Sequence, residues 1–301
     1  MLDALDRRRI KCMIASSAVL RRPARPVMST KTSSKRRAPL PADPAQLTGP
    51  AHSLDQRARL LNQRLANTSE QVRANYLRML DMSWIYHDAV LDGVVYTSQE
   101  IDAALDSRAY DRLLASTEAS LHGTIEDIRL HKKLLDRVRQ LAGTDEPVSV
   151  DMIREFSLIL HPEEGDLKSV KYRKDIPQHR LYFHEYCQPD KIAARVRAVV
   201  DWVNDPEVIA SRSSVRLAGR AHYDLLRVFP FSHDSGKISR MLMNLLLLRA
   251  GHAPAIVDAR ERQRYYEALK GSPVTMNQLV TDSITNGLNS VERLLENTER
   301  A

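Results

Sequence analysis

A short polar loop between two apolar segments holds the residues best suited to chemistry. It brings together an imidazole, a carboxylate, a hydroxyl, a glycine and two cations, namely His233, Asp234, Ser235, Gly236, Lys237 and Arg240. The apolar segments on either side have helical periodicity, so we predict a helix, a loop and the N-terminus of a second helix. Backbone N–H groups and the dipole at a helix N-terminus favour anions, which predicts a site for phosphate.

The two cations would strengthen this site. Lys237 and Arg240 lie three positions apart and therefore share one face of the predicted helix. Gly236 has no side chain and would let a ligand approach the backbone closely. The same residues also fit a plainer interpretation, in which an ordinary capped helix begins here and its Lys and Arg are solvated. The residues alone leave both interpretations open.

The loop resembles the signature motif of the Fic (Fido-fold) family, which reads His-Pro-Phe-x-Asp/Glu-Gly-Asn-Gly-Arg-x-x-Arg. Pro230, Phe231, Gly236 and Arg240 match this motif, and Lys237 keeps a positive charge at an arginine position. The resemblance implies transfer of AMP from ATP to a Ser, Thr or Tyr hydroxyl of a target protein. It also implies that the motif His deprotonates this hydroxyl, that the acidic residue holds Mg²⁺, and that the amides and arginines bind phosphate.

Four positions of the motif depart from the family in ways that change this chemistry. Phe229 replaces the catalytic His and has no titratable atom, so it cannot act as a general base and is expected to pack in the core. His233 replaces the metal-binding carboxylate, and Mg²⁺ prefers oxygen ligands, so an ordinary metal site is not expected. Asp234 and Ser235 replace the Gly-Asn pair, and the charge of Asp234 would repel phosphate.

Other segments extend the resemblance over roughly residues 80–290. The resemblance assigns Arg262 and Tyr265 to the adenine end of the nucleotide. It assigns Tyr172 and Arg173 to a flap that docks target proteins, and Asp92 and Gly93 to an inhibitory helix. The family's inhibitory helix carries a Glu that pairs with the second Arg of the motif. The pattern here is Asp88-x-x-x-Asp92-Gly93, and we expect the shorter Asp92 to reach Arg240 less easily.

Three hypotheses about function follow. The leading one is a Fic-fold pseudoenzyme that lacks ordinary AMP transfer and acts by binding a nucleotide or anion, or by protein interactions through its flap. The alternative is an active nucleotidyltransferase, or a transferase with another phosphate-bearing donor, in which His233 serves as a relocated base or Asp234 takes over the metal. The third is a structural partner that binds no nucleotide. ATP is a candidate ligand in the first two, and Mg²⁺ is doubtful.

The elements that must position the loop are predicted to be helices. Aromatic residues make up only 5% of the chain, and abundant Leu, Ala and Arg favour helix. Periodicity and capping signals predict helical segments at about 53–91, from Thr97, and at 121–141, 150–160, 189–202, 212–228, 238–250, 260–270 and 274–295. Extended residues at 180–183 predict a short β-hairpin. We therefore expect an all-α Fido-fold bundle with a small β-hairpin flap.

Composition divides the chain into three parts. Residues 1–50 are rich in Arg, Pro, Ser and Lys and are predicted to form a disordered basic tail. Residues 1–39 hold 11 Lys/Arg and 2 Asp, a net charge of +9, so the rest of this chain of net charge +7 carries 7 − 9 = −2. We expect an N-terminal helical part at 51–145, with a degenerate inhibitory-type helix, and a Fic core at 146–301.

These features limit the partners and the location. A slightly acidic body makes nucleic-acid binding an unfavoured function. The two cysteines, Cys12 and Cys187, form neither a disulfide framework nor a metal site. No apolar run approaches the ~20 residues that span a bilayer, and no secretory cleavage site follows the short apolar stretch near the N-terminus. We expect a cytoplasmic protein that binds a target or partner protein through its flap and binds no membrane; a homodimer is left open.

Overall fold

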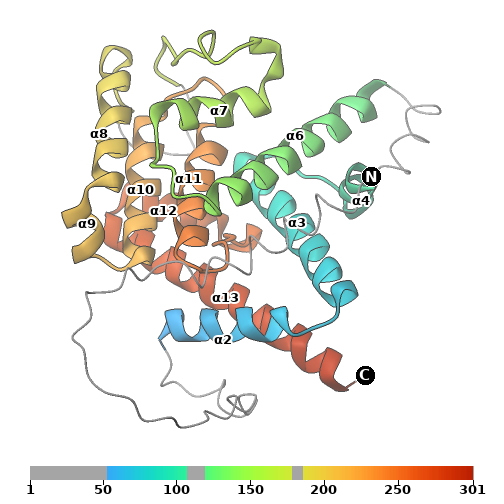
Figure 1. Ribbon diagram of the computed structural model, residues 1–301. Helices are drawn as coiled ribbons and strands as arrows, with labels where there is room; N and C mark the ends of the chain where they lie inside the picture. The colour runs from blue at the N-terminus through green and yellow to red at the C-terminus, as the bar shows by residue number, and fades with distance from the viewer. Residues whose placement is uncertain (1–52, 107–118, 178–185, 301) are drawn as a thin grey trace, which may run out of the picture.

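The computed structural model describes residues 53–106, 119–177 and 186–300 (Figure 1). Within these residues the chain is helical and contains no strand, which agrees with the expected all-α class. The predicted basic tail and the tip of the predicted β-hairpin lie outside the described residues. The described backbone before that tip, at 165–177, consists of turns and irregular structure.

The helices of the N-terminal part are α2 (Leu54–Ala66), α3 (Glu70–Asp92), α4 (Ser98–Leu105) and α6 (Ala119–Ala142). The helix predicted from Thr97 is confirmed as α4, which begins with a capping box. The Glu100 N–H donates to Thr97 Oγ1 at 3.2 Å, and the Thr97 N–H donates to the Glu100 carboxylate at 2.6 Å. These reciprocal bonds satisfy amide groups that a helix start leaves without partners.

The prediction of one helical segment at about 53–91 is wrong in one respect, because the structure has two separate helices there, α2 and α3. Ser69 begins α3 by accepting a hydrogen bond from the Val72 N–H at 3.3 Å. A serine in this place stabilises a new helix start, so the backbone turns although the apolar period continues.

The C-terminal part continues with α7 (Val150–Leu160), α8 (Ile192–Asn204), α9 (Pro206–Ser211), α10 (Ser214–Val228), α11 (Ser235–Arg249), α12 (Arg262–Lys270) and α13 (Pro273–Arg300), with 3₁₀ turns at Pro162–Glu164, Pro189–Lys191 and Ala259–Glu261. The sequence did not predict α9. Helix α11 begins at Ser235, three residues earlier than expected, because the Asp234 carbonyl already accepts a helical hydrogen bond from the Ile238 N–H at 2.8 Å.

Helix α11 lies at the centre of the bundle and carries most of the signature chemistry (Figure 1). Of its 15 residues, 13 are buried, and it packs against α10, α6, α7 and α3. A helix that is apolar almost all round is stable only when other elements surround it. Its polar Asn244 is satisfied inside the core, because its Oδ1 accepts a hydrogen bond from the Ala255 N–H at 2.7 Å.

One apolar core runs from Ala58 in α2 to Leu295 in α13 and includes residues of every described α-helix except α9. It includes residues on both sides of position 145, so the proposed boundary between an N-terminal part and a Fic core stays a prediction. Arg57 of α2 and Glu292 of α13 add an ion pair at 2.8 Å where these helices run side by side (Figure 1). In the part of the chain that the structure describes, no helix has both the length and the apolar character to span a membrane.

Candidate functional site

The signature loop, residues 229–234, joins α10 to α11 and has a strained residue at each end. Phe229 and Asp234 have φ angles of 49° and 52°. Among the described residues they alone combine a side chain with a positive φ. The left-handed conformation costs an L-residue about 1–2 kcal/mol, so contacts of the side chains must hold both ends of the loop in place.

Two buried side chains close this loop. Ser235 Oγ accepts a hydrogen bond from the Phe231 N–H at 2.8 Å and donates one to the Phe231 carbonyl at 2.9 Å. Arg173 Nε donates to the Phe229 carbonyl at 2.6 Å, and the Arg173 N–H donates to the Pro230 carbonyl at 3.0 Å. Ser235, predicted to bind an anion, and Arg173, predicted to lie in the docking flap, therefore both serve the shape of the loop in this structure.

The two phenylalanines of the loop pack in the core, as was predicted for Phe229. Phe229 is 7% exposed and its ring lies 5.2 Å from the ring of Tyr186. Phe231 is 3% exposed and its ring lies 5.6 Å from that of Tyr172. Tyr172 is assigned to the start of the flap, and Tyr186 lies in the next described segment along the chain. The position of the motif base is thus occupied by an aromatic ring that packs against the base of the flap.

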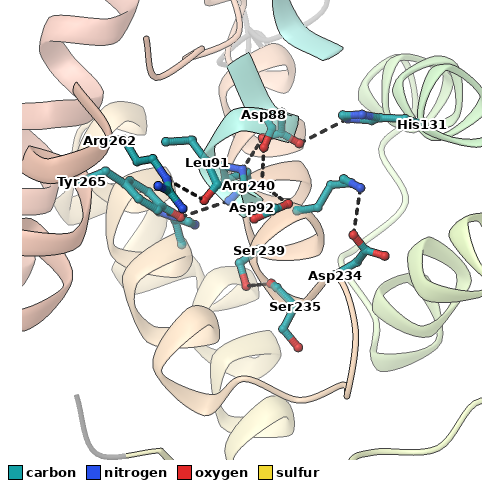
Figure 2. Close-up of polar contacts among 12 residues, drawn as sticks. Asp88, Leu91, Asp92, His131, Asp234, Ser235, Ser239, Arg240, Arg262 and Tyr265 are labelled. Atoms are coloured by element: carbon teal, nitrogen blue, oxygen red, sulfur yellow. Dashed lines mark hydrogen bonds and ion pairs between the residues drawn. The ribbon is translucent and has the colours of Figure 1, made fainter. Parts of the chain in front are cut away.

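Arg240 is held inside the protein by two carboxylates from α3 (Figure 2). Only 2% of its side chain is exposed. Its Nε pairs with Asp88 Oδ1, its Nη2 lies 2.7 Å from Asp92 Oδ2, and its Nη1 donates to the Tyr265 hydroxyl at 3.3 Å. The expectation that Asp92 would reach Arg240 less easily is therefore wrong. The contact between α3 and α11 brings Asp92 within reach of Arg240 despite its shorter side chain.

His131 of α6 completes what we term the Arg240 cluster, which consists of Asp88, Asp92, His131 and Arg240. Its Nε2 lies 3.2 Å from Asp88 Oδ2. Burial opposes ionisation of Asp88, but the charge of Arg240 and the adjacent His131 outweigh it and lower the Asp88 pKa to about 2. Burial raises the pKa of Asp92 despite Arg240, and burial lowers the pKa of His131. The guanidinium is thus paired first with Asp88.

The second cation of the motif has a carboxylate partner of its own. Lys237 Nζ lies 2.8 Å from Asp234 Oδ1, and His161 Nε2 lies 2.9 Å from Asp234 Oδ2. Burial disfavours the charge of Asp234, but the hydrogen bond with His161 and the Lys237 charge hold its pKa well below the usual range. The hydrogen bond to Asp234 raises the pKa of His161, whose Nδ1 also lies 3.2 Å from Glu163. Two carboxylates therefore stabilise the imidazolium form of His161.

Known proteins show the same domain and the same fold. A family model described as the Fic/DOC family matches residues 126–247. "Protein adenylyltransferase Fic" from Drosophila willistoni is 40% identical over 188 residues, which are 62% of this chain and 36% of that protein. Residues 126–247 are thus similar to the Fic/DOC family. The protein of the same name from Nematostella vectensis is 27% identical over 187 residues, or 62% of this chain and 42% of that one. The chain thus spans well under half the length of these Fic relatives.

Solved structures of Fic proteins share the fold. A Fic domain-containing signaling protein from Bacteroides thetaiotaomicron superposes with a TM-score of 0.58 at 20% identity, over 80% of this chain and 95% of that one. Fic-1 from C. elegans superposes with a TM-score of 0.62 at 18% identity, over 82% of this chain and 73% of that one.

The residues present do not fit the Mg²⁺ site that the Fic family implies. His233, at the position of the metal-binding carboxylate, is exposed, and its ring lies 5.8 Å from that of His161. Asp234 supplies the nearest carboxylate, and both of its oxygens are engaged, by Lys237 and His161. A hard cation would have to displace these partners and accept imidazole nitrogen where it prefers oxygen.

The residues assigned to the adenine end are also engaged inside the protein. Tyr265 is fully buried, and its hydroxyl lies 3.2 Å from His222 Nε2. Arg262 is half-buried, and its Nε donates to the Tyr266 hydroxyl at 3.1 Å. Gly93 ends α3 with φ 91°, and a Cβ there would lie 3.5 Å from Arg262. This side of the site therefore joins α12 to the end of α3.

Three members of this constellation were not identified as site residues from the sequence: Asp88, His131 and His161. The first had a signal, since Asp88 and Asp92 are four residues apart and therefore share a face of a helix that is otherwise largely apolar there. The histidines had none. His161 meets Asp234 across 73 positions of sequence, and only packing brings them together.

Proposed function

We propose that this Fic-fold protein does not transfer AMP by the usual route of its family and acts by binding a partner protein. The proposal rests on Phe229, which stands at the position of the family's catalytic His. A proton acceptor is needed where the target hydroxyl is deprotonated, and loss of a general base typically lowers the rate ~10²–10⁴-fold. The Phe229 ring offers no such atom, and its packing against Tyr186 leaves it no other role than a structural one.

The charges around the motif support the same proposal. Lys237 and Arg240 already have carboxylate partners in Asp234, Asp88 and Asp92, so the five side chains sum to a net negative charge. A phosphate chain would have to displace these carboxylates. Breaking a buried ion pair typically costs about 3–5 kcal/mol, which corresponds to an affinity lower by ~10²–10⁴-fold. We therefore expect weak binding of ATP.

One observation favours the alternative, an active transferase. In the family a carboxylate of the inhibitory helix pairs with the second Arg of the motif, and here Asp92 makes this contact. A restrained site implies an activity to restrain, and the curated relatives bear the name protein adenylyltransferase. In that case His233 is the candidate base, because it is exposed, whereas both ring nitrogens of His161 are engaged by carboxylates.

Label transfer from ATP separates the two proposals. The full chain is incubated with ATP labelled on the α-phosphate and with Mg²⁺, alongside the variant Asp92→Gly, and incorporation into protein is measured. We expect none from either. Incorporation that appears or rises in Asp92→Gly and disappears in Asp92→Gly/His233→Ala would establish the active transferase instead.

Calorimetry with ATP tests the binding part of the proposal. We expect no saturation up to about 1 mM ATP, which corresponds to a binding free energy weaker than about −4 kcal/mol. Micromolar binding that is lost in Lys237→Ala would show that a phosphate site operates in spite of the internal carboxylates. The triple variant Phe229→His/His233→Asp/Asp234→Gly restores three of the four departing motif positions and leaves Ser235 unchanged. Transfer by this variant would show that the rest of the site is intact.

A further inference from the structure

A groove of about 950 Å³ lies outside the site described above, between α8 and α10. Lys191, which caps the start of α8, lines one wall with Arg195 and Trp202 of α8, and Arg220 and Arg227 of α10 line the other. The spacings of four and seven residues place each set on one face of its helix. Each helix thus turns its apolar face to the core and a mixed face to the groove.

The groove is positively charged on a body that is not. Its walls carry Lys191, Arg195, Arg220 and Arg227 against Asp224, a net charge of +3. Arg220 pairs with Asp224 at 2.5 Å, and Arg227 donates to the Leu269 carbonyl at 3.2 Å. Lys191 and Arg195 are exposed, and neither has a side-chain partner among the described residues. Residues 40–301 together carry −2, so the groove is more positive than the body around it.

Apolar side chains also line the groove. Val199 and Trp202 follow the cations along α8, and Arg212 lies over the Trp202 ring at 5.5 Å. Ile176, beside the predicted flap, is 48% exposed and also lines the groove. Seven residues of helix separate Arg195 from Trp202, which is a rise of about 10 Å. An extended peptide covers this distance in about three residues.

We propose that this groove binds an acidic segment of a partner protein, with carboxylates at Lys191 and Arg195 and an apolar or aromatic side chain about three residues away at Trp202. The inference deepens the proposed binding role and rests on it. Charge complementarity is its basis, because two exposed cations without partners attract carboxylates. A nucleic acid is the less favoured occupant, since Asp224 lies among the cations and the body is acidic.

Selection from a library of random displayed peptides tests the proposal directly and needs no ATP. The bait is the full chain, and peptides that also bind Lys191→Glu/Arg195→Glu are removed. We expect enrichment of Asp and Glu with a Phe, Trp or Leu about three positions away. No enrichment of acidic residues would overturn the proposal, even if the protein proved inactive in AMP transfer.

Fluorescence anisotropy with the most enriched labelled peptide then locates its binding. Lys191→Glu/Arg195→Glu and Trp202→Ala should each weaken binding about tenfold or more, and the affinity should fall as salt rises from ~50 to ~300 mM. Arg197→Glu is the matched control, because Arg197 is an exposed cation of α8 that does not line the groove, and it should change the affinity less than about twofold.

Equal losses in the Arg197→Glu control would show non-specific attraction and overturn the proposal. Tighter binding of labelled poly-uridine than of the peptide, lost in the double variant, would assign the groove to nucleic acid instead. Circular dichroism of every variant separates loss of binding from loss of fold. Because this assay contains no nucleotide, its failure and the appearance of AMP transfer are independent results.

Discussion

Substituting Asp88 with Ala removes one of the two carboxylates that hold Arg240 against α3. Both side chains of this pair are almost fully buried, with 3% and 2% exposed, whereas 19% of Asp92 is exposed. Removing one partner of a buried pair leaves a buried charge and typically costs about 3–5 kcal/mol, while exposed pairs are worth about 0–1 kcal/mol. Since Asp92 still compensates Arg240, we expect about 3 kcal/mol for Asp88→Ala and about 1 kcal/mol for Asp92→Ala.

Thermal and urea unfolding followed by circular dichroism measure this difference. For a chain of this size 1 kcal/mol shifts the melting temperature by about 2–4 °C, so Asp88→Ala should lower it by about 6–12 °C and Asp92→Ala by about 2–4 °C. Asp201→Ala is the control, because Asp201 is an exposed carboxylate of α8 and such substitutions usually stay within about 0.5 kcal/mol.

A double-mutant cycle with Arg240→Met isolates the pair. Once the guanidinium is gone, Asp88 no longer gains from it, so Asp88→Ala/Arg240→Met should be more stable than the sum of the single losses predicts, by about 2 kcal/mol. Additive losses, or a larger loss for Asp92→Ala than for Asp88→Ala, would refute the reasoning that Arg240 is paired first with Asp88.

Three further predictions concern the loop and the packing around it. The folded-state pKa of His161 is raised, so the stability that the protonated imidazole contributes is complete below about pH 6.5 and is lost as the pH rises through the folded-state pKa. In NMR titrations Asp234→Asn should return the His161 pKa toward 6.5, and an unchanged pKa would refute the pairing of His161 with Asp234. Arg173→Lys removes the guanidinium that donates hydrogen bonds to several backbone carbonyls, so the free energy of unfolding in urea should fall by about 1–3 kcal/mol. An unchanged urea midpoint would mean that other contacts hold the loop. A Cβ at Gly219 of α10 would lie 2.3 Å from Asn277 Oδ1 of α13. Gly219→Val should therefore lower the free energy of unfolding by about 1–3 kcal/mol, and adding Asn277→Ala should restore part of this stability. A Gly219→Val protein as stable as the wild type would contradict this close approach.

Sequence reasoning located most of the helices because their signals are local. Capping at Thr97 depends on a residue three positions away, and apolar periods predicted α6, α7 and α10 to within two residues. Its errors at Ser69 and Ser235 concern boundaries. A cap or a left-handed residue there overrides the apolar period, and the period does not register either feature.

The sequence by itself determined what the site lacks: an atom that could take a proton at Phe229, and an oxygen ligand at His233. These are properties of residue type, and no packing changes them. Tertiary structure alone decided what the cations do. Arg240 meets Asp88 across 152 positions, and Asp234 meets His161 across 73, so the choice of partner depended on how α3, α7 and α11 pack. Charges interact strongly only at a separation of a few ångströms in a dry interior, and sequence spacing does not specify that separation between distant segments.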